Sequence, residues 1–137
     1  MRLKTSHGLT LTEILVSMVI FAIVLLAMTG LMDVIQHNNT YNHQFTVASF
    51  LTQAKMEELQ NFSFSDANLD PTTNWTPTTP ETLTATGLAA TDGRYRRQWK
   101  ISADTPVAGL KSLEVRTAWT DGKKKDHEVS YSSAKAP

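Results

Sequence analysis

The feature that most constrains this chain is a long apolar run near its N-terminus. From Ile14 to Met32 there is no charged residue, and only Ser17, Thr29 and Gly30 interrupt the apolar side chains. As a helix, a run of this length would extend about 28 Å, close to the hydrocarbon thickness of a bilayer. A chain of 137 residues has too little other hydrophobic surface to enclose such a helix. We therefore interpret the run as a membrane-spanning helix rather than a buried core helix.

The flanking charges indicate an orientation. Arg2 and Lys4 precede the run, and the next Lys or Arg is Lys55. This asymmetry predicts a cytoplasmic N-terminus, with most of the chain outside. A secretory signal peptide or a plain single-pass anchor gives a similar profile. The apolar part of a signal peptide is usually shorter, however, and residues 27–30 match its cleavage site poorly.

A carboxylate, Glu13, stands directly before the apolar run, and Gly8 lies five positions earlier. Ionisable groups in a membrane segment are costly and are usually functional. The alternative is an ordinary acidic residue in the first helical turn, favoured there by the helix dipole. The coincidence of Gly8, Glu13 and a basic leader favours a functional role.

The segment from Lys4 to Val16 resembles the class III signal of type IV prepilins and type II secretion pseudopilins. In that family a prepilin peptidase cuts after the Gly that ends a short basic leader. The new N-terminus is methylated, and Glu is the fifth residue of the mature chain. Gly8 and Glu13 match these positions, whereas Leu9 and Thr12 replace commoner residues. The resemblance implies cleavage between Gly8 and Leu9, and methylation of Leu9.

Elementary chemistry is consistent with this interpretation. Gly8 has no side chain and can enter a narrow protease cleft in an extended form. The cut would create an α-amine at Leu9, which could pair with Glu13 of a neighbouring subunit and favour one axial register. Without a partner, a buried Glu13 would cost on the order of several kcal/mol. Gly30 is a weak point, about 1 kcal/mol less favourable in a helix than Ala; close packing between membrane helices explains it equally well.

The pattern becomes amphipathic from Asp33 to about Phe62. One stripe at helical spacing is expected to cover a sheet; it comprises Tyr41, Phe45, Ala48, Met56, Leu59 and Phe62. A second set, Val47, Phe50 and Ala54, falls on the opposite side, where a soluble monomer should not expose apolar residues without a reason. In a filament this second face would meet neighbouring helices. The alternative is a loop folded back over it.

Residues 63–92 are rich in Thr and Pro and predict a surface connection with one short strand near Leu83. In pilin-like proteins this segment is the αβ-loop, and Trp75 is its expected anchor. Alternating segments and the turn signals at residues 92–93 and 121–122 then predict an antiparallel meander with one apolar face. Arg97 belongs to the inward set, and we expect it to reach past the sheet edge or to cap a carboxylate such as Glu57 or Glu58.

The predicted fold class is α+β. A long N-terminal helix, transmembrane in its first half and amphipathic in its second, packs on a C-terminal antiparallel sheet of three to four strands. The expected parts are a leader (1–8), a transmembrane or filament-core helix (9–32), an amphipathic helix (33–62), the αβ-loop (63–92) and the sheet (93–137). The sheet also resembles that of minor pilins of the PilV type and of the minor pseudopilin I group.

The sequence offers little for catalysis. The absence of Cys excludes disulfides, thiolate metal sites and a cysteine nucleophile. The four histidines, at positions 7, 37, 43 and 127, have no convincing partner carboxylate, and the aspartates fit no calcium loop. We therefore expect no enzyme activity, no cofactor and no metal. Zero net charge gives no general attraction to nucleic acid. The lysines at 123–125 predict a solvated turn, with DNA or lipid contact as the alternative.

The resemblance implies a structural subunit, a minor pilin or pseudopilin, of a type IV pilus or a type II secretion filament. Its implied partners are prepilin peptidase, other pilin or pseudopilin subunits, the inner-membrane assembly platform and membrane lipid. The implied location is the inner membrane in a single pass, with the C-terminal domain in the periplasm, and the filament or cell surface after assembly. The alternative is a single-pass, membrane-anchored periplasmic binding module. The position of the cut distinguishes the two.

Overall fold

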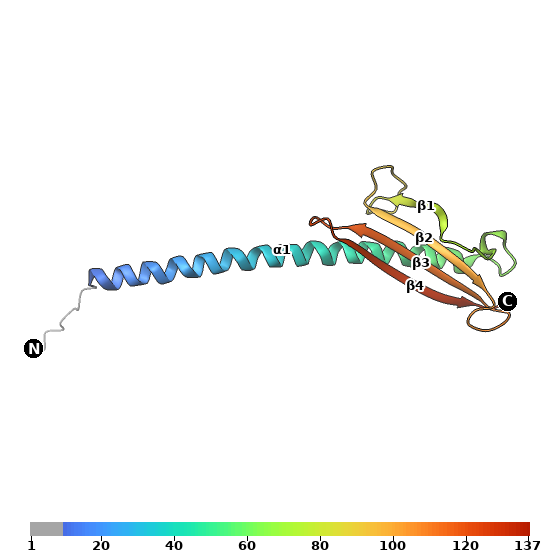
Figure 1. Ribbon diagram of the computed structural model, residues 1–137, viewed down its shortest axis with the longest axis horizontal. Helices are drawn as coiled ribbons and strands as arrows, with labels where there is room; N and C mark the ends of the chain where they lie inside the picture. The colour runs from blue at the N-terminus through green and yellow to red at the C-terminus, as the bar shows by residue number, and fades with distance from the viewer. Residues whose placement is uncertain (1–9) are drawn as a thin grey trace, which may run out of the picture. The chain divides into compact units, whose positions relative to one another are not determined.

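The computed structural model describes residues 10–137, so Gly8 and Leu9 lie outside the described residues. One continuous helix, α1, spans Leu11–Asn61 (Figure 1). By its internal contacts the chain divides into two compact units, Met1–Thr40 and Tyr41–Pro137, and α1 contributes to both.

The first unit, where the structure describes it, is the first half of α1, called the apolar half because it contains the uncharged run of residues 14–32; its last residues, 36–40, are polar. Thr10 precedes the first helical residue, and its hydroxyl accepts the backbone N–H of Glu13 at 3.3 Å. A Thr three residues before a Glu is the sequence pattern of a helix capping box. From Leu11 to Gln36 every residue is exposed. The segment is long and apolar enough to cross a membrane, and none of its apolar window is buried.

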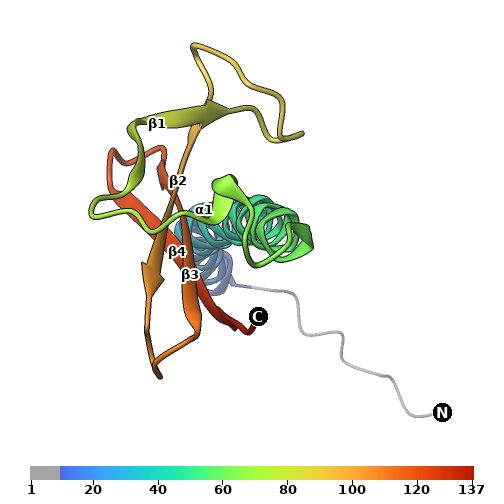
Figure 2. The same ribbon diagram turned by 90° about the vertical axis from the view of Figure 1, so that its right-hand side faces the viewer.

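The second unit places residues 41–61 of α1 against a four-stranded sheet (Figure 2). The strands are β1 (Thr76–Leu83), β2 (Tyr95–Ala103), β3 (Lys111–Thr120) and β4 (Asp126–Lys135), and a short 3₁₀ helix, η1 (Ala67–Leu69), follows α1. The sheet order is β1-β2-β3-β4, and each neighbouring pair is antiparallel. The α+β fold and the meander predicted from sequence are confirmed.

Two apolar clusters join the helix to the sheet. In the first, Ala48 and Leu51 of α1 are buried with Leu83, Tyr95, Trp119 and Val129. In the second, Met56 and Leu59 of α1 are buried with Leu69, Ile101, Leu113 and Val115. The hydroxyls of Thr52 and Thr117 lie 2.8 Å apart, so this buried pair is hydrogen-bonded within the core.

The predicted helical stripe is correct at most positions. Ala48, Met56 and Leu59 are buried, and Tyr41 and Phe62 pack against the clusters. Phe45 was placed wrongly in the covered set, because 44% of it remains exposed, although its ring lies 6.4 Å from that of Trp119. The buried stripe instead includes Leu51 and Thr52, which the apolar periodicity did not single out.

The segment expected to be a connection with a short strand contains the eight-residue edge strand β1. Two prolines, Pro77 and Pro80, lie inside it. A proline cannot donate to a strand ladder, so it is tolerated at an edge. The register of β1 against β2 is correspondingly irregular between Thr76 and Glu81. Because an edge strand tolerates prolines, the Thr- and Pro-rich composition of β1 resembled that of a loop.

The expectation that Arg97 meets a carboxylate is correct, but the partner is Glu81 and not the suggested Glu57 or Glu58. The Arg97 guanidinium donates to Glu81 from Nε (3.1 Å) and Nη2 (2.8 Å), and from Nη1 to the carbonyl of Leu51 (3.2 Å). Glu81 lies directly opposite Arg97 in the β1–β2 register. The pair formed because β1 is a strand, which the sequence pattern did not show.

A glycine at the entry to β2 fixes the turn between β1 and β2. A Cβ on Gly93 would lie 2.6 to 2.7 Å from backbone atoms of Leu83, closer than backbone can accommodate. We expect Gly93→Ala to lower the free energy of unfolding by about 1–3 kcal/mol, because the strand ends must move apart. Urea unfolding followed by tryptophan fluorescence measures this.

The matched control is Gly122→Ala, since a Cβ on Gly122 meets nothing within 4 Å. It should leave the free energy of unfolding nearly unchanged. Equal stability of Gly93→Ala and the wild type would contradict the packing described here.

Candidate functional site

The Glu13 carboxylate opens the apolar segment without a partner in the described structure. Glu13 is exposed, and among residues 10–137 its side chain makes no hydrogen bond or ion pair. Its backbone is well held, because its N–H bonds to Thr10 and its carbonyl accepts from the Ser17 hydroxyl at 2.8 Å. Ile14, Ser17, Met18 and Phe21 line a shallow depression in the adjoining turns. An acidic group therefore stands beside an uncovered apolar surface.

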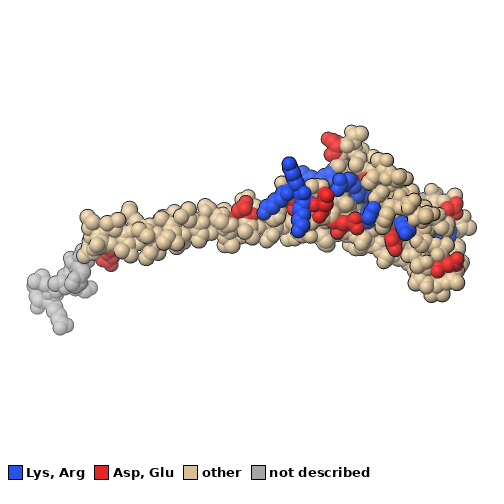
Figure 3. All heavy atoms as spheres, in the orientation of Figure 1, with Lys and Arg blue, Asp and Glu red and all other residues tan. Residues whose placement is uncertain are grey.

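Charge is sparse over this part of the helix. From residue 10 to 40 the only charged side chains are Glu13 and Asp33. Figure 3 shows this stretch as almost uncharged, whereas Lys and Arg gather over the second unit. An all-round apolar helix without a partner is stable in lipid or against other apolar helices, not in water.

Gly30 lies within α1, which continues through it without a break. A Cβ at this position would meet nothing within 4 Å. No contact among the described residues therefore requires a glycine here. Any requirement for glycine must come from a neighbour outside this chain or from a change in helix shape.

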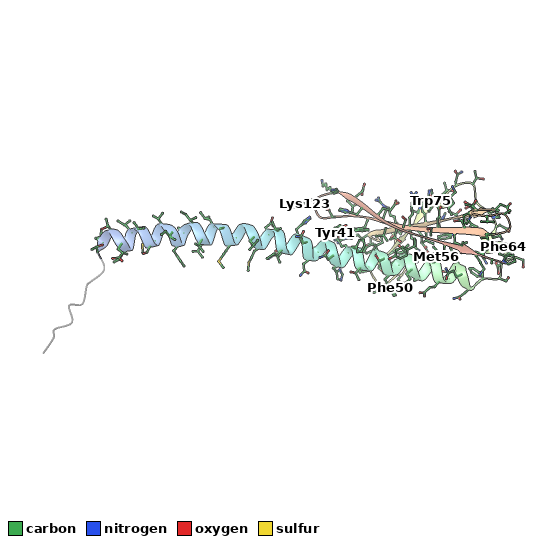
Figure 4. The ribbon with its side chains drawn as sticks, turned by 90° about the horizontal axis from the view of Figure 1, so that it is seen from below. Tyr41, Phe50, Met56, Phe64, Trp75 and Lys123 are labelled. Carbon is green, nitrogen blue, oxygen red and sulfur yellow. The ribbon has the colours of Figure 1, made fainter. Side chains whose placement is uncertain are left out.

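The second predicted face has two exposed members rather than three. Phe50 is 63% exposed and lies on the side of α1 away from the strands (Figure 4), and Ala54 is also exposed. No described loop covers them, so the folded-back loop is wrong. Val47 was placed wrongly on this face, because it is half-buried against the first cluster. It stands four residues before Leu51, which puts it on the flank of the buried stripe.

The turn between β3 and β4 holds a His–Asp pair that the sequence reading missed. His127 Nε2 lies 3.0 Å from Asp121 Oδ2, and Asp121 Oδ1 accepts the backbone N–H groups of Lys123 (2.8 Å) and Lys125 (2.9 Å). The statement that no histidine has a partner carboxylate was therefore wrong for His127. The two residues are six positions apart, a spacing that becomes a contact only across a hairpin.

Aromatic rings connect this turn to the helix. His127 stacks on Trp119 with ring centroids 5.4 Å apart, and the Tyr41 and His127 rings form a T-shaped pair with centroids 5.0 Å apart. The hydrogen bond from His127 and that from the Lys125 backbone lower the pKa of Asp121 to about 2. The lysines form the predicted turn, and Lys124 takes a left-handed backbone conformation with φ of 61°.

Two further expectations from the sequence concern metal binding and Trp75. Among residues 10–137 there is no group of three or more His, Asp or Glu side chains that could hold a metal ion. Trp75, the expected anchor of the Thr-rich segment, is half-buried, with the guanidinium carbon of Arg116 4.1 Å from the centre of its ring.

Comparison with protein families identifies the N-terminal segment. Residues 3–29 match the prokaryotic N-terminal methylation motif. The chain carries a type IV pilin-like prepilin signal. The matched prepilin signal includes Gly8, Leu9 and Glu13 and ends within the apolar half of α1. Comparisons with curated proteins and with solved structures gave no match.

The hydrogen bonds to Asp121 predict a pH dependence of stability. Its folded-state pKa of about 2 lies below the ordinary value of 3.8. The hydrogen bonds to the ionised Asp121 therefore stabilise the folded state fully above about pH 4, and this stabilisation is lost as the pH falls from about 4 toward 2. We expect the urea midpoint of Asp121→Asn to fall less than that of the wild type as the pH is lowered from 4 to 2. Urea unfolding at pH values from 2 to 7 measures this.

Asp92→Asn is the matched control, since Asp92 lies in the other turn and its side chain makes no hydrogen bond among residues 10–137. Its urea midpoint should change with pH as that of the wild type does. An Asp121→Asn protein with the same acid dependence as the wild type would refute the role given to this pair.

Proposed function

We propose that this chain is a minor pilin or pseudopilin, a structural subunit of a type IV pilus or a type II secretion filament. The observation that carries the proposal is the apolar half of α1. It is exposed on every side, it begins at an unpartnered Glu13, and it follows a prepilin signal. Prepilin peptidase would cut after Gly8, and Leu9 would be the methylated N-terminus.

The start of the helix supports cleavage at this point. The hydrogen bond that caps α1 joins Thr10 to Glu13, and both residues would remain in the mature chain. Removal of residues 1–8 would therefore leave the cap intact. It would also leave the whole apolar segment on the protein, unlike ordinary signal cleavage.

Glu13 would fix the register of assembly. Between apolar helices its charge would be buried without a counter-charge, because no described residue of its own chain pairs with it. The α-amine of Leu9 in a neighbouring subunit would supply that counter-charge. Only one axial offset brings the two together, so the pair would select the correct neighbour position.

Two further features would serve contacts between subunits. Gly30 leaves open space on the helix surface, which lets another helix approach closely. Phe50 and Ala54 add an exposed apolar face on the second unit. Before assembly, membrane lipid would cover the apolar half of α1, and the inner-membrane assembly platform would extract the subunit.

The proposed topology is a single pass in the inner membrane. Arg2 and Lys4 would keep the N-terminus in the cytoplasm, and the second unit would lie in the periplasm. After assembly it would lie on the filament. We propose no catalytic activity for the chain, which would be the substrate of a peptidase and not itself an enzyme.

Removing the charge at Glu13 tests this proposal. We expect Glu13→Leu and Glu13→Gln to be cleaved normally, because the cut lies five residues away. Incorporation into filaments should fall at least about tenfold, the factor that corresponds to 1.4 kcal/mol of lost pairing. Immunoblots measure the size shift on cleavage and the amount of protein in sheared filaments.

Asp33→Asn is the matched control, since it removes the other charge of the same helix segment. It should be both cleaved and incorporated. Normal incorporation of Glu13→Leu and Glu13→Gln would overturn the proposed pairing.

A further inference from the structure

The sheet has a hollow on the face that points away from α1. Its volume is about 300 Å³, at the lower end of the range for small-molecule sites. It lies beside the Trp-bearing segment before β1 and over strands β3 and β4, and it is lined by Trp75, Glu114, Glu128, Ser130, Tyr131 and Ser132. Figure 4 labels Trp75 beside the strands. The hollow lies entirely within the second unit.

A chain of contacts holds the Trp75 ring in place. The Arg116 guanidinium carbon lies 4.1 Å from the centre of the ring, within the range of a cation–π contact. Arg116 Nη2 donates to Gln98 Oε1 at 2.9 Å, and Gln98 Nε2 donates to the Pro77 carbonyl at 2.8 Å. The ring is thus fixed by a neighbouring strand and by its own segment, which reduces the entropy lost when a ligand stacks on it.

The polar lining of the hollow has unused hydrogen-bonding capacity. Ser132 is directly opposite Glu114 in the β3–β4 register, and Ser130 is two positions along on the same face. Within residues 10–137 the side chains of Glu114, Ser130 and Ser132 make no hydrogen bond with protein. Two hydroxyls and a carboxylate therefore point outward as free donors and acceptors.

The charges around the hollow balance. Glu128 lies 3.6 Å from Arg116 Nη1, and Glu114 has Lys100 directly opposite it on β2. A strongly charged ligand would find no net attraction here. A sugar ring fits this chemistry, because its C–H face stacks on an aromatic ring and its hydroxyls bond to carboxylate and serine oxygens.

We propose that this hollow binds a neutral saccharide, with Trp75 as the stacking platform and Glu114, Ser130 and Ser132 as hydrogen-bonding partners. A site of this size suits a mono- or disaccharide unit. The proposal does not depend on filament assembly, because every residue in it belongs to the sheet unit. A filament subunit or an anchored binding module could carry it equally.

Binding is tested on the full chain in an amine oxide detergent, since detergents with sugar headgroups would compete. The probes are cellobiose, lactose and N,N′-diacetylchitobiose, with a tetralysine peptide as a charged probe. Calorimetry should show binding of at least one disaccharide with a Kd of about 1 mM. Trp75→Ala should weaken it at least about tenfold, the loss of one aromatic stacking contact.

Glu114→Gln and Ser132→Ala provide a second test, because neither touches the contacts that hold Trp75. Each should weaken the same disaccharide several-fold while the protein keeps its urea midpoint. Lys123→Ala, in the turn between β3 and β4, is the matched control and should bind as the wild type does.

Three results would overturn the proposal. The first is no binding of any of the three disaccharides at concentrations up to about 10 mM. The second is binding that Trp75→Ala and Glu114→Gln leave unchanged. The third is binding of tetralysine in preference to every disaccharide, which would mean that the hollow is an acidic surface that binds basic peptides.

Discussion

The burial of one stripe of α1 against one face of the sheet is the interaction on which the folded unit depends. Ala48 and Leu51 supply one cluster, and Met56 and Leu59 supply the other. Each buried Leu or Met contributes about 1.5–3 kcal/mol relative to an exposed one. Leu69 of η1 joins the second cluster, but α1 contributes to both clusters, so the apolar face of the sheet depends mainly on the helix to cover it.

Before residue 40 the same helix has no such partner among the described residues. Residues 14–32 are apolar on every side and exposed, whereas the part of the helix after residue 40 is buried on one side only. One element therefore requires two environments, an apolar one for the first part and an aqueous one for the second. The match to the N-terminal methylation motif, residues 3–29, lies at the apolar end of the chain and away from the sheet in sequence.

Periodicity predicted those parts of the structure that depend on local sequence. Alternation over residues 95–101 and 113–120 predicted β2 and β3, and helical spacing predicted the buried Ala48, Met56 and Leu59. Contacts that depend on register were missed. Arg97 pairs with Glu81 because a proline-containing segment forms a strand, and His127 pairs with Asp121 because a hairpin closes between them. The position of Trp75 on Arg116 likewise depends on how its segment crosses the face of the sheet opposite α1, and the periodicity of the sequence does not predict this crossing.

The most direct test of the account is the mass of the mature N-terminus. The protein would be purified from cells that contain a prepilin peptidase, and its N-terminal peptide would be analysed by mass spectrometry. The account predicts that the chain begins at Leu9 and carries an added methyl group. An intact Met1, or a cut after Ala27, would contradict it and favour an anchored binding module or an ordinary secreted domain.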